Sequence, residues 1–364
     1  MCCAACARQG CSAAAAPQAR HKSLTATSRK PLPLATQAPT GPVTSPPPLF
    51  VGSPPLFWAQ ALPWATTMHI QSIPLLRYPR TPHLEGSRLQ LDDDGRDQTP
   101  LSALDGCYAV IEEKLDGANS AVSFSEAAEL LLQSRGHYLA GGARERQFNL
   151  LKVWARAHED AFLSVLEDRY VMYGEWLYAK HSCWLDQLPH YFTEFDVYDR
   201  HTGKFLSTAR RRALLQGVPV LPVPVLYEGP MPTDPRLLWA LVTRSLAKSA
   251  NWRSNFEAHV ARQGLPLELT WKQTDKSDKS EGLYLKIENQ DEVLGRYKLV
   301  RADFTQTILD SDSHHADRPV LPNLLAPTAD IYSPTLTCSW EDLGLQTLRG
   351  LDELKAAFPT KGRR

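Results

Sequence analysis

The chain has 364 residues, of which 43% are hydrophobic, and its 40 basic and 40 acidic residues give a formal net charge of zero. This size and composition suit one large or two modest domains with a packed core. Because residues 1–67 hold five basic and no acidic residues, the remainder has 35 basic against 40 acidic residues, a net charge of −5. This charge argues against a protein that coats nucleic acid, so a nucleic-acid contact would need a local basic patch. No apolar run in the sequence reaches the roughly 18 residues of a membrane helix, so we expect no membrane partner.

Residues 1–67 differ in composition from the rest of the chain. They hold 11 of the 28 prolines and five basic residues but no Asp or Glu. Such a segment buries too little apolar surface to offset its ordering entropy, so we predict a disordered leader. An acid-free leader resembles a transit peptide. We favour translated upstream sequence, with Met68 as the start, because the patterned chain begins abruptly there.

The cysteines predict free thiols and no metal site. Cys3 and Cys6 have the spacing of a zinc-ligand pair, but no second pair follows at a suitable distance. Cys107, Cys183 and Cys338 are scattered, which is typical of proteins in a reducing compartment. We therefore expect a cytoplasmic protein, and we expect it to be a monomer.

A proline-stiffened segment, Tyr78–Leu84, suits a strap or lid over the core. The stretch Tyr108–Phe124, further along the chain, has the pattern of a strand, a tight turn and a second strand. An apolar run leads into Lys114. Gly117 takes positive φ without strain, and Asp116 can bond to its own backbone. A lysine at such a turn, partly desolvated and among other cations, can lose its proton and act as a nucleophile. The alternative is a surface hairpin with a solvated lysine.

Downstream, the spacing of apolar residues predicts a mixture of strands and helices. The predicted strands are Tyr170–Tyr178, Tyr191–Tyr198, Gly282–Glu288 and Val293–Val300, with a proline-broken edge strand at Val218–Leu226. The predicted helices are Arg144–Leu166, Ser207–Leu215, a helix that starts at Asp234, Trp252–Arg262 and a last helix near Leu345–Phe358. We interpret the segment from about 207 to 265 as a helical insertion.

Six runs follow the order of the motifs of the covalent nucleotidyltransferases, the superfamily of ATP-dependent DNA and RNA ligases and GTP-dependent capping enzymes. They are Lys114–Asn119 (motif I), Ser134–Gly136 (Ia), Tyr173–Trp176 (III), Phe192–Asp196 (IIIa), Glu281–Lys286 (IV) and Arg296–Arg301 (V). The sequence most resembles the RNA ligases that seal nicks in duplex RNA, because Ala118 and Asn119 follow the glycine of motif I and because motif III has a similar form.

The resemblance implies an α+β fold over residues 68–301. This fold is a nucleotidyltransferase domain, an ATP-grasp-like ligase adenylation domain of antiparallel sheets with flanking helices. DNA ligases and capping enzymes carry a further OB domain of roughly 80–100 residues, usually of five strands. Residues 302–364 show no five-strand pattern, so we expect a short tail with a terminal helix and no OB domain. This departure argues against both of those families.

The resemblance also implies the chemistry of the main site residues. Lys114 would attack the α-phosphorus of ATP as a neutral amine. Lys286 and Lys298 would lower the pKa of Lys114 by like-charge repulsion and would stabilise the transferring phosphoryl group. Glu175 and Glu281 would lie at the ribose and at a divalent metal, Mg²⁺ or Mn²⁺.

Five further residues receive roles from the same resemblance. Phe195 would stack on adenine, and Arg135 would lie near the 5′-phosphate end or the ribose. Arg296 stands in the nucleotide site where relatives often have lysine. Asn119 would contact the RNA 5′-phosphate after adenylation. Asp116 is expected to organise the turn and not to act as a base.

The implied activity is that of an ATP-dependent RNA ligase that joins 3′-hydroxyl and 5′-phosphate RNA ends through a lysyl-AMP intermediate, in RNA repair. A capping-type guanylyltransferase and an inactive RNA-binding module on the ligase fold are the alternatives. A nick in duplex RNA, a broken tRNA and a splint on DNA are all compatible substrates. Cations of the insertion could follow RNA phosphates or form a solvated face, namely Arg244, Lys248, Arg253 and Arg262.

Overall fold

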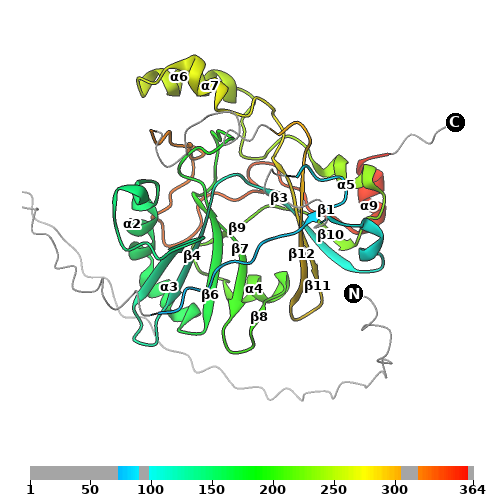
Figure 1. Ribbon diagram of the computed structural model, residues 1–364, viewed down its shortest axis with the longest axis horizontal. Helices are drawn as coiled ribbons and strands as arrows, with labels where there is room; N and C mark the ends of the chain where they lie inside the picture. The colour runs from blue at the N-terminus through cyan, green and yellow to red at the C-terminus, as the bar shows by residue number, and fades with distance from the viewer. Residues whose placement is uncertain (1–72, 90–97, 305–318, 360–364) are drawn as a thin grey trace, which may run out of the picture. The chain divides into compact units, whose positions relative to one another are not determined.

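The computed structural model describes residues 73–89, 98–304 and 319–359 (Figure 1). The predicted leader, residues 1–67, and its cysteines lie outside these residues. The described residues all belong to one structural unit that runs from Thr66 to Arg364. Among them, no helix is long and apolar enough to cross a membrane.

Two β-sheets with flanking helices form the molecule, in agreement with the predicted α+β class (Figure 1). The seven-stranded sheet has the order β13-β10-β3-β11-β12-β1-β2. Its strands are β1 (His83–Leu84), β2 (Gln98–Thr99), β3 (Tyr108–Lys114), β10 (Val225–Pro230), β11 (Gly282–Glu288), β12 (Val293–Val300) and β13 (Leu348–Arg349). The six-stranded sheet has the order β5-β4-β6-β7-β8, with β9 beside β7. Its strands are β4 (Ala118–Phe124), β5 (Leu130–Ser134), β6 (Tyr170–Trp176), β7 (Phe192–Asp199), β8 (Lys204–Phe205) and β9 (Leu221–Pro222).

Both sheets are mixed, whereas we predicted antiparallel sheets. The long strands do pair antiparallel with one another. The parallel pairings are β1 with β2 and β12, β10 with β13, and β7 with β9. Each of them involves a two-residue strand. Strands this short carry no alternating pattern, so the sequence offered no signal for them.

The strands on either side of Lys114 do not form a hairpin. β3 pairs with β10 and β11, whereas β4 pairs with β5 and β6. The chain therefore passes from one sheet to the other between Lys114 and Ala118. Gly117 is needed at this crossing, because a Cβ atom there would lie 2.6 Å from the Trp176 carbonyl oxygen. The local turn signal was correct, but it did not identify the strand partners.

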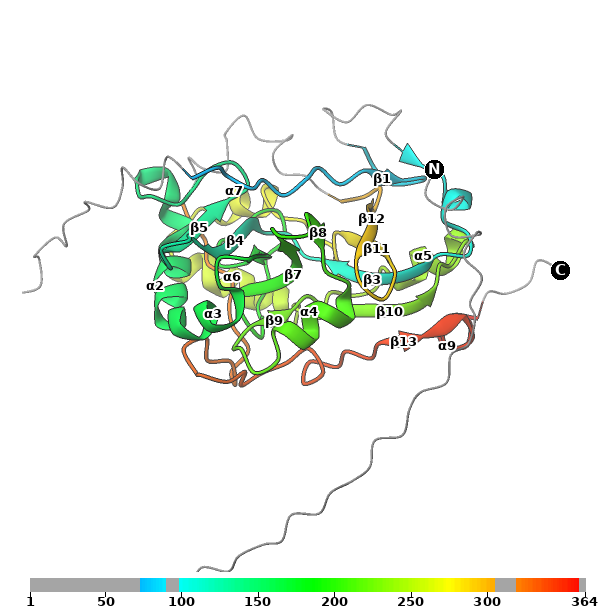
Figure 2. The same ribbon diagram turned by 90° about the horizontal axis from the view of Figure 1, so that it is seen from below.

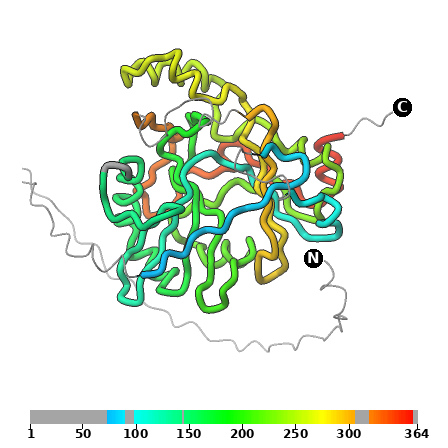
Figure 3. Tube along the Cα trace, in the orientation of Figure 1, coloured from blue at the N-terminus to red at the C-terminus, as the bar shows by residue number. Residues whose placement is uncertain are grey.

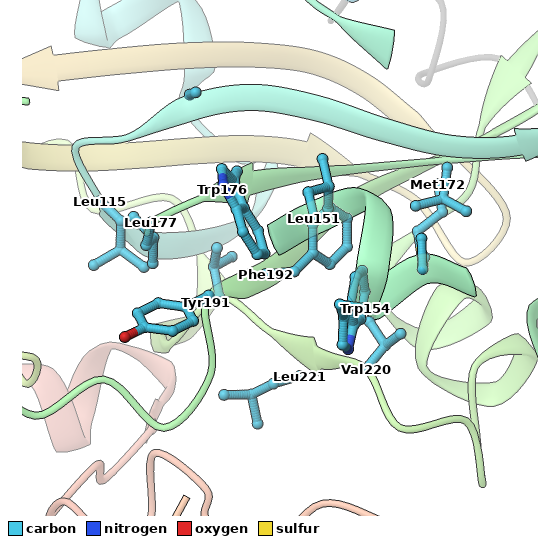
Figure 4. Close-up of a cluster of buried hydrophobic side chains, with 14 of the residues drawn as sticks. Leu115, Leu151, Trp154, Met172, Trp176, Leu177, Tyr191, Phe192, Val220 and Leu221 are labelled. Atoms are coloured by element: carbon cyan, nitrogen blue, oxygen red, sulfur yellow. The ribbon is translucent and has the colours of Figure 1, made fainter. Parts of the chain in front are cut away.

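The predicted helix over 144–166 is three consecutive helices: η4 (Ala143–Phe148), α2 (Asn149–Ala157) and α3 (Glu159–Leu166). The break falls at His158, whose backbone φ is −114° and whose Nε2 lies 2.8 Å from the Ile331 carbonyl oxygen. α2 places Trp154 in the core that Figure 4 shows, where it stacks on Phe192 with ring centroids 5.0 Å apart. The helices thereby cover the six-stranded sheet with an apolar face.

The segment from about 207 to 265 is only partly a helical insertion. Its helices are α4 (Thr208–Leu214), α5 (Pro235–Leu241) and α6 (Trp252–Arg262). Between α4 and α5, however, β10 lies inside the seven-stranded sheet, with β3 on one side and β13 on the other. The prediction of an edge strand at Val218–Leu226 is therefore wrong for β10, which buries Val225 and Tyr227. Prolines before Val225 suggested an edge, but they end before the paired residues begin.

The C-terminal described residues close one border of the seven-stranded sheet. Within residues 319–359 the chain forms β13 and then α9 (Gly350–Ala357). The position of α9 agrees with the predicted last helix. Figure 2 shows β13 and α9 beside β10. Leu354 of α9 is fully buried in the core of this sheet. The absence of an OB domain stays a prediction.

A strap of residues 74–84 joins the two sheets, and Figure 3 shows it in blue across both of them. At one end, the Leu76 carbonyl oxygen accepts hydrogen bonds from Gln133 Nε2 at 2.8 Å and from Tyr173 hydroxyl at 2.8 Å. At the other end, Lys298 N donates to the Pro82 carbonyl oxygen at 3.0 Å. The strap therefore fits the expectation for this proline-stiffened segment.

We expect a chain that begins at Met68 to be as stable as the full chain, because the described strap contacts begin at Pro74. A chain that begins at Glu85 loses Tyr78 and β1, both buried, and should lose about 3 kcal/mol or more of unfolding free energy. Urea unfolding of the three chains measures both effects. If the chain that begins at Glu85 is as stable as the full chain, the strap contributes nothing to stability. If the chain that begins at Met68 is much less stable than the full chain, residues 1–67 contribute to stability.

Candidate active site

A cavity of about 490 Å³ lies at the point where the chain crosses from β3 to β4. Its walls come from both sheets and from the strap. Seven of the nine predicted site residues line it, namely Lys114, Asn119, Arg135, Glu175, Phe195, Glu281 and Lys298. The structure therefore gathers residues that are up to 184 positions apart in the sequence into one site.

Lys114 lies at the end of β3 and reaches into this cavity. Its Nζ is 2.6 Å from Glu281 Oε2, and its side chain is 25% exposed. The pairing of Lys114 with Gly282 across β3 and β11 brings Glu281 to this place. Gly282 is required there, because a Cβ atom would lie 1.9 Å from the Leu299 carbonyl oxygen.

The crossing segment is held in place by two carboxylates. Gly117 N donates to Glu175 Oε1 at 3.0 Å. Asp116 Oδ2 accepts hydrogen bonds from the backbone N–H groups of Ser182 and Cys183, at 2.6 and 2.7 Å. Asp116 therefore organises the loop, as predicted, by tying it to the segment that follows β6.

The pKa of Lys114 is raised, which contradicts the predicted depression. Burial lowers this pKa, but the negative charges of Glu281, Glu175 and Asp116 outweigh burial and hold the proton on the amine. The prediction counted the cations Lys286 and Lys298 and overlooked the carboxylates. In the protein alone, Lys114 is therefore an ammonium ion paired with Glu281.

The two carboxylates beside Lys114 are themselves perturbed. Burial raises the pKa of Glu175 to about 7, with Asp116 and Glu281 adding to the rise and Lys114 opposing it. Burial likewise raises the pKa of Glu281, against the lowering effect of Lys114. Among the described residues, no group of three or more His, Cys, Asp or Glu side chains could hold a metal. Two carboxylates do suit Mg²⁺ or Mn²⁺ when water and phosphate oxygens complete the shell.

Lys286 and Arg296 do not line the cavity, in contrast to their predicted roles. Lys286 is fully buried, with Nζ 2.9 Å from Glu112 Oε1 and 3.4 Å from Asp196 Oδ1. Arg296 Nη1 lies 3.5 Å from Asp196 Oδ2, and its guanidinium lies 3.8 Å from the centre of the Phe205 ring. Their charges are therefore compensated inside the protein, one layer behind the cavity wall. Lys286 also donates to the Phe195 carbonyl oxygen, and so helps to hold that wall in place.

A buried network of charges connects these residues, and the sequence analysis missed it. Arg211 of α4 is 1% exposed, and its guanidinium contacts Glu112 at 2.5 Å and Glu194 at 2.9 Å. Three basic and three acidic side chains take part, so the network is neutral: Arg211, Lys286 and Arg296 with Glu112, Glu194 and Asp196. It joins β3, β7, β11 and β12 across the two sheets.

Other cavity residues were also missed. Tyr78 of the strap donates to Asp196 Oδ2 at 2.5 Å, and its hydroxyl lies 2.6 Å from that of Tyr284. Glu112 and Tyr284, which were not predicted, are neighbours of the predicted Lys298 in register across β3, β11 and β12. Glu112 could have been found from the sequence, since residues two apart in a strand share a face and Glu112 precedes Lys114 by two.

Comparison with known proteins identifies the family of this chain. A model of the RNA ligase family matches residues 108–300, more than half of the chain. The chain therefore belongs to the RNA ligase family. No curated protein matches the chain.

Several solved structures of an RNA ligase from Naegleria gruberi are similar to the chain. A variant with ATP and Mn is 18% identical, with a TM-score of 0.37, over 55% of this chain and 51% of that one. The structure with pyrophosphate is 18% identical, with a TM-score of 0.39, over 67% of each chain. A variant with AMP and Mn is also 18% identical, with a TM-score of 0.38, over 64% of each. The chain thus spans about half the length of the first of these relatives.

Proposed function

We propose that the protein is an ATP-dependent RNA ligase that joins a 3′-hydroxyl and a 5′-phosphate end of RNA through a lysyl-AMP intermediate. The observation that carries the proposal is the position of Lys114, whose amine lies on the wall of a polar cavity between two sheets and 2.6 Å from Glu281. We further propose that it repairs nicks in duplex RNA, acts as a monomer and works in the cytoplasm.

The residues of the cavity fit a nucleotide and a divalent cation. Two buried oxygen atoms on its wall, Glu112 Oε2 and Asn119 Oδ1, have no hydrogen-bond partner among the described residues. Phe195 offers an aromatic ring for a base, and Arg135 and Lys298 offer positive charge for phosphates. Glu175 and Glu281 would hold Mg²⁺ or Mn²⁺, whose charge would offset the carboxylates that keep Lys114 protonated.

The proposed reaction has three steps. The neutral Nζ of Lys114 attacks the α-phosphorus of ATP, a phosphorus–nitrogen bond forms and pyrophosphate leaves. An oxygen of the RNA 5′-phosphate then attacks the same phosphorus, and the lysine amine leaves. Finally the RNA 3′-hydroxyl attacks the 5′-phosphate, the phosphodiester forms and AMP leaves. In each step the protein contributes positioning and charge stabilisation.

Incubation of the protein with α-labelled ATP or GTP and Mg²⁺, followed by denaturing gel electrophoresis, tests the proposal. We expect a covalent adduct with ATP alone. An adduct with GTP alone would favour the capping-type guanylyltransferase. The absence of an adduct with either nucleotide would favour an inactive RNA-binding module.

Asn119 is proposed to serve the RNA 5′-phosphate and not ATP. It follows the nucleophile on β4, opposite Glu175 in register, and its side chain reaches the cavity with an unpartnered oxygen. We expect Asn119→Ala to form Lys114-AMP at the native rate but to seal a pre-adenylated nick roughly 10- to 150-fold more slowly. This range corresponds to the loss of one hydrogen bond to a charged group, about 1.5–3 kcal/mol. Single-turnover sealing and adduct formation are measured side by side.

Ser120→Ala is the matched control for this experiment. Ser120 is the next residue on β4 and points to the opposite face, where its hydroxyl donates to the Ala118 carbonyl oxygen at 3.0 Å. This variant should perform both steps at native rates. If Asn119→Ala slows adduct formation as much as sealing, Asn119 has no special role toward RNA.

A further inference from the structure

A groove beside α7 (Leu267–Lys272) carries positive charge and lies outside the site described above. It consists of two adjoining hollows of about 410 and 540 Å³. Both are lined by Trp271, Lys272 and Lys276. Figure 1 shows α6 and α7 in yellow at the top of the molecule, away from the two sheets.

Two exposed lysines, Lys272 and Lys276, line this groove, and a third exposed lysine, Lys279, follows them in the chain. The side-chain amines of Lys272, Lys276 and Lys279 have no ion pair or hydrogen bond among the described residues, although all three lie within eight positions of the chain. Arg253 also lies on the rim, where it is ion-paired with Asp278. Residues 68–364 carry five more acidic than basic residues, so this concentration of free positive charge runs against the charge of its surroundings.

The acidic residues of the groove are largely compensated. Asp275 is ion-paired with the buried Arg301, whose Nη1 also lies 3.1 Å from Asp303 Oδ1. Asp278 is 2.8 Å from Arg253. Glu268 is the one carboxylate in the two hollows that no basic side chain of the described residues contacts. The groove therefore presents a positive surface to an anion.

The segment that lines the groove is hydrogen-bonded to segments of the candidate active site. Asp275 N donates to the Ser182 carbonyl oxygen at 2.8 Å, and Ser182 N donates to Asp116 of the crossing segment. Arg301 N donates to the Glu281 carbonyl oxygen at 3.1 Å. Lys279 precedes Glu281 by two residues. The segment that lines the groove is therefore held by the same segments that carry Asp116 and Glu281 of the candidate active site.

The sequence had pointed to other cations in this region, and the structure assigns most of them to the fold. Lys248 is buried, donates to the Ser277 carbonyl oxygen at 2.7 Å and lies over the Trp252 ring. Arg253 forms an ion pair with Asp278, and Arg244 donates a hydrogen bond to the Ser249 carbonyl oxygen. The unpaired lysines of the groove are thus better placed to meet a ligand.

We propose that this groove binds the sugar-phosphate backbone of the RNA substrate, a proposal that rests on the ligase function proposed above. Lys272, Lys276 and Lys279 contact successive phosphates away from the end being joined. Half-buried Trp271 lines both hollows with Lys272 and Lys276. Contacts of this kind give affinity and register without reading the base sequence.

The test is a triple variant, Lys272→Gln, Lys276→Gln and Lys279→Gln, measured with a labelled RNA duplex that contains one nick with a 5′-phosphate. Fluorescence anisotropy over a series of salt concentrations gives the affinity and its salt dependence. Each lost phosphate contact lowers the slope of log K against log salt by about 0.7–0.9, so we expect a slope shallower by about 2 and an affinity weaker by at least about tenfold. Sealing should fall at low RNA concentration and recover at high RNA concentration, while Lys114-AMP forms at the native rate.

The matched control removes the same charge elsewhere. Arg156→Gln, Lys204→Gln and Lys355→Gln change three exposed cations on α2, β8 and α9, and two of these form surface ion pairs of small energetic value. An unchanged affinity and salt slope in the groove variant, or an equal loss in the control, would overturn the proposal. Loss of Lys114-AMP formation in the groove variant would also overturn it. If the native protein forms no adduct with ATP but the groove variant still loses RNA affinity, the proposed ligase function is wrong, whereas the proposed binding of RNA by the groove is supported.

Discussion

Lys114→Ala and Lys114→Arg should each form no detectable covalent adduct with α-labelled ATP and Mg²⁺. The adduct needs a neutral primary amine at this position. Alanine has none, and the arginine guanidinium stays protonated in proteins. The loss should be complete and not graded, because among the described lysines only Lys114 lies at the crossing of the two sheets. Gel detection of the labelled protein measures it.

Lys152→Arg is the matched control. Lys152 has the same side-chain exposure as Lys114, 25%, and also pairs with a buried glutamate, Glu145, at 2.5 Å. This variant should form the adduct at the native level. A full adduct on either Lys114 variant would refute the assignment of the nucleophile. Equal unfolding temperatures for the native protein and the Lys114 variants would show that the loss is chemical.

Arg211→Met should destabilise the protein by about 3–5 kcal/mol. Arg211 is 1% exposed and neutralises both Glu112 and Glu194, which are also buried. Removal of one partner from a buried ion network leaves uncompensated charge in a low-dielectric interior, and this costs far more than the network contributes. Urea unfolding monitored by tryptophan fluorescence measures the change in the free energy of unfolding.

The next residue provides the control for this measurement. Arg212 pairs with Glu228 at 2.7 Å, but its side chain is 41% exposed. Arg212→Met should therefore cost at most about 1 kcal/mol. If the two substitutions lower the free energy of unfolding equally, the buried position of the Arg211 ion pairs has no particular effect on stability. Because Glu112 also lines the cavity, Arg211→Met should weaken ATP binding as well, a second effect that Arg212→Met should lack.

Much of the secondary structure and most of the site followed from local patterns in the sequence. The strands at Gly282–Glu288 and Val293–Val300 and the helix at Trp252–Arg262 have the predicted boundaries. The motif matches identified seven residues that meet in one cavity. These features succeed because alternation, helical spacing and turn residues act within a few positions of the chain.

The tertiary structure alone decided the charge state and the partners of these residues. The chain around Lys114 could have been a hairpin, and only the pairing of β3 and β4 with different strands places the lysine between two sheets. The raised pKa of Lys114 and the burial of Lys286 both arise from carboxylates brought in from distant strands. Electrostatic energy depends on distances and burial in the folded protein, whereas the spacing of charges along the chain does not specify either of them.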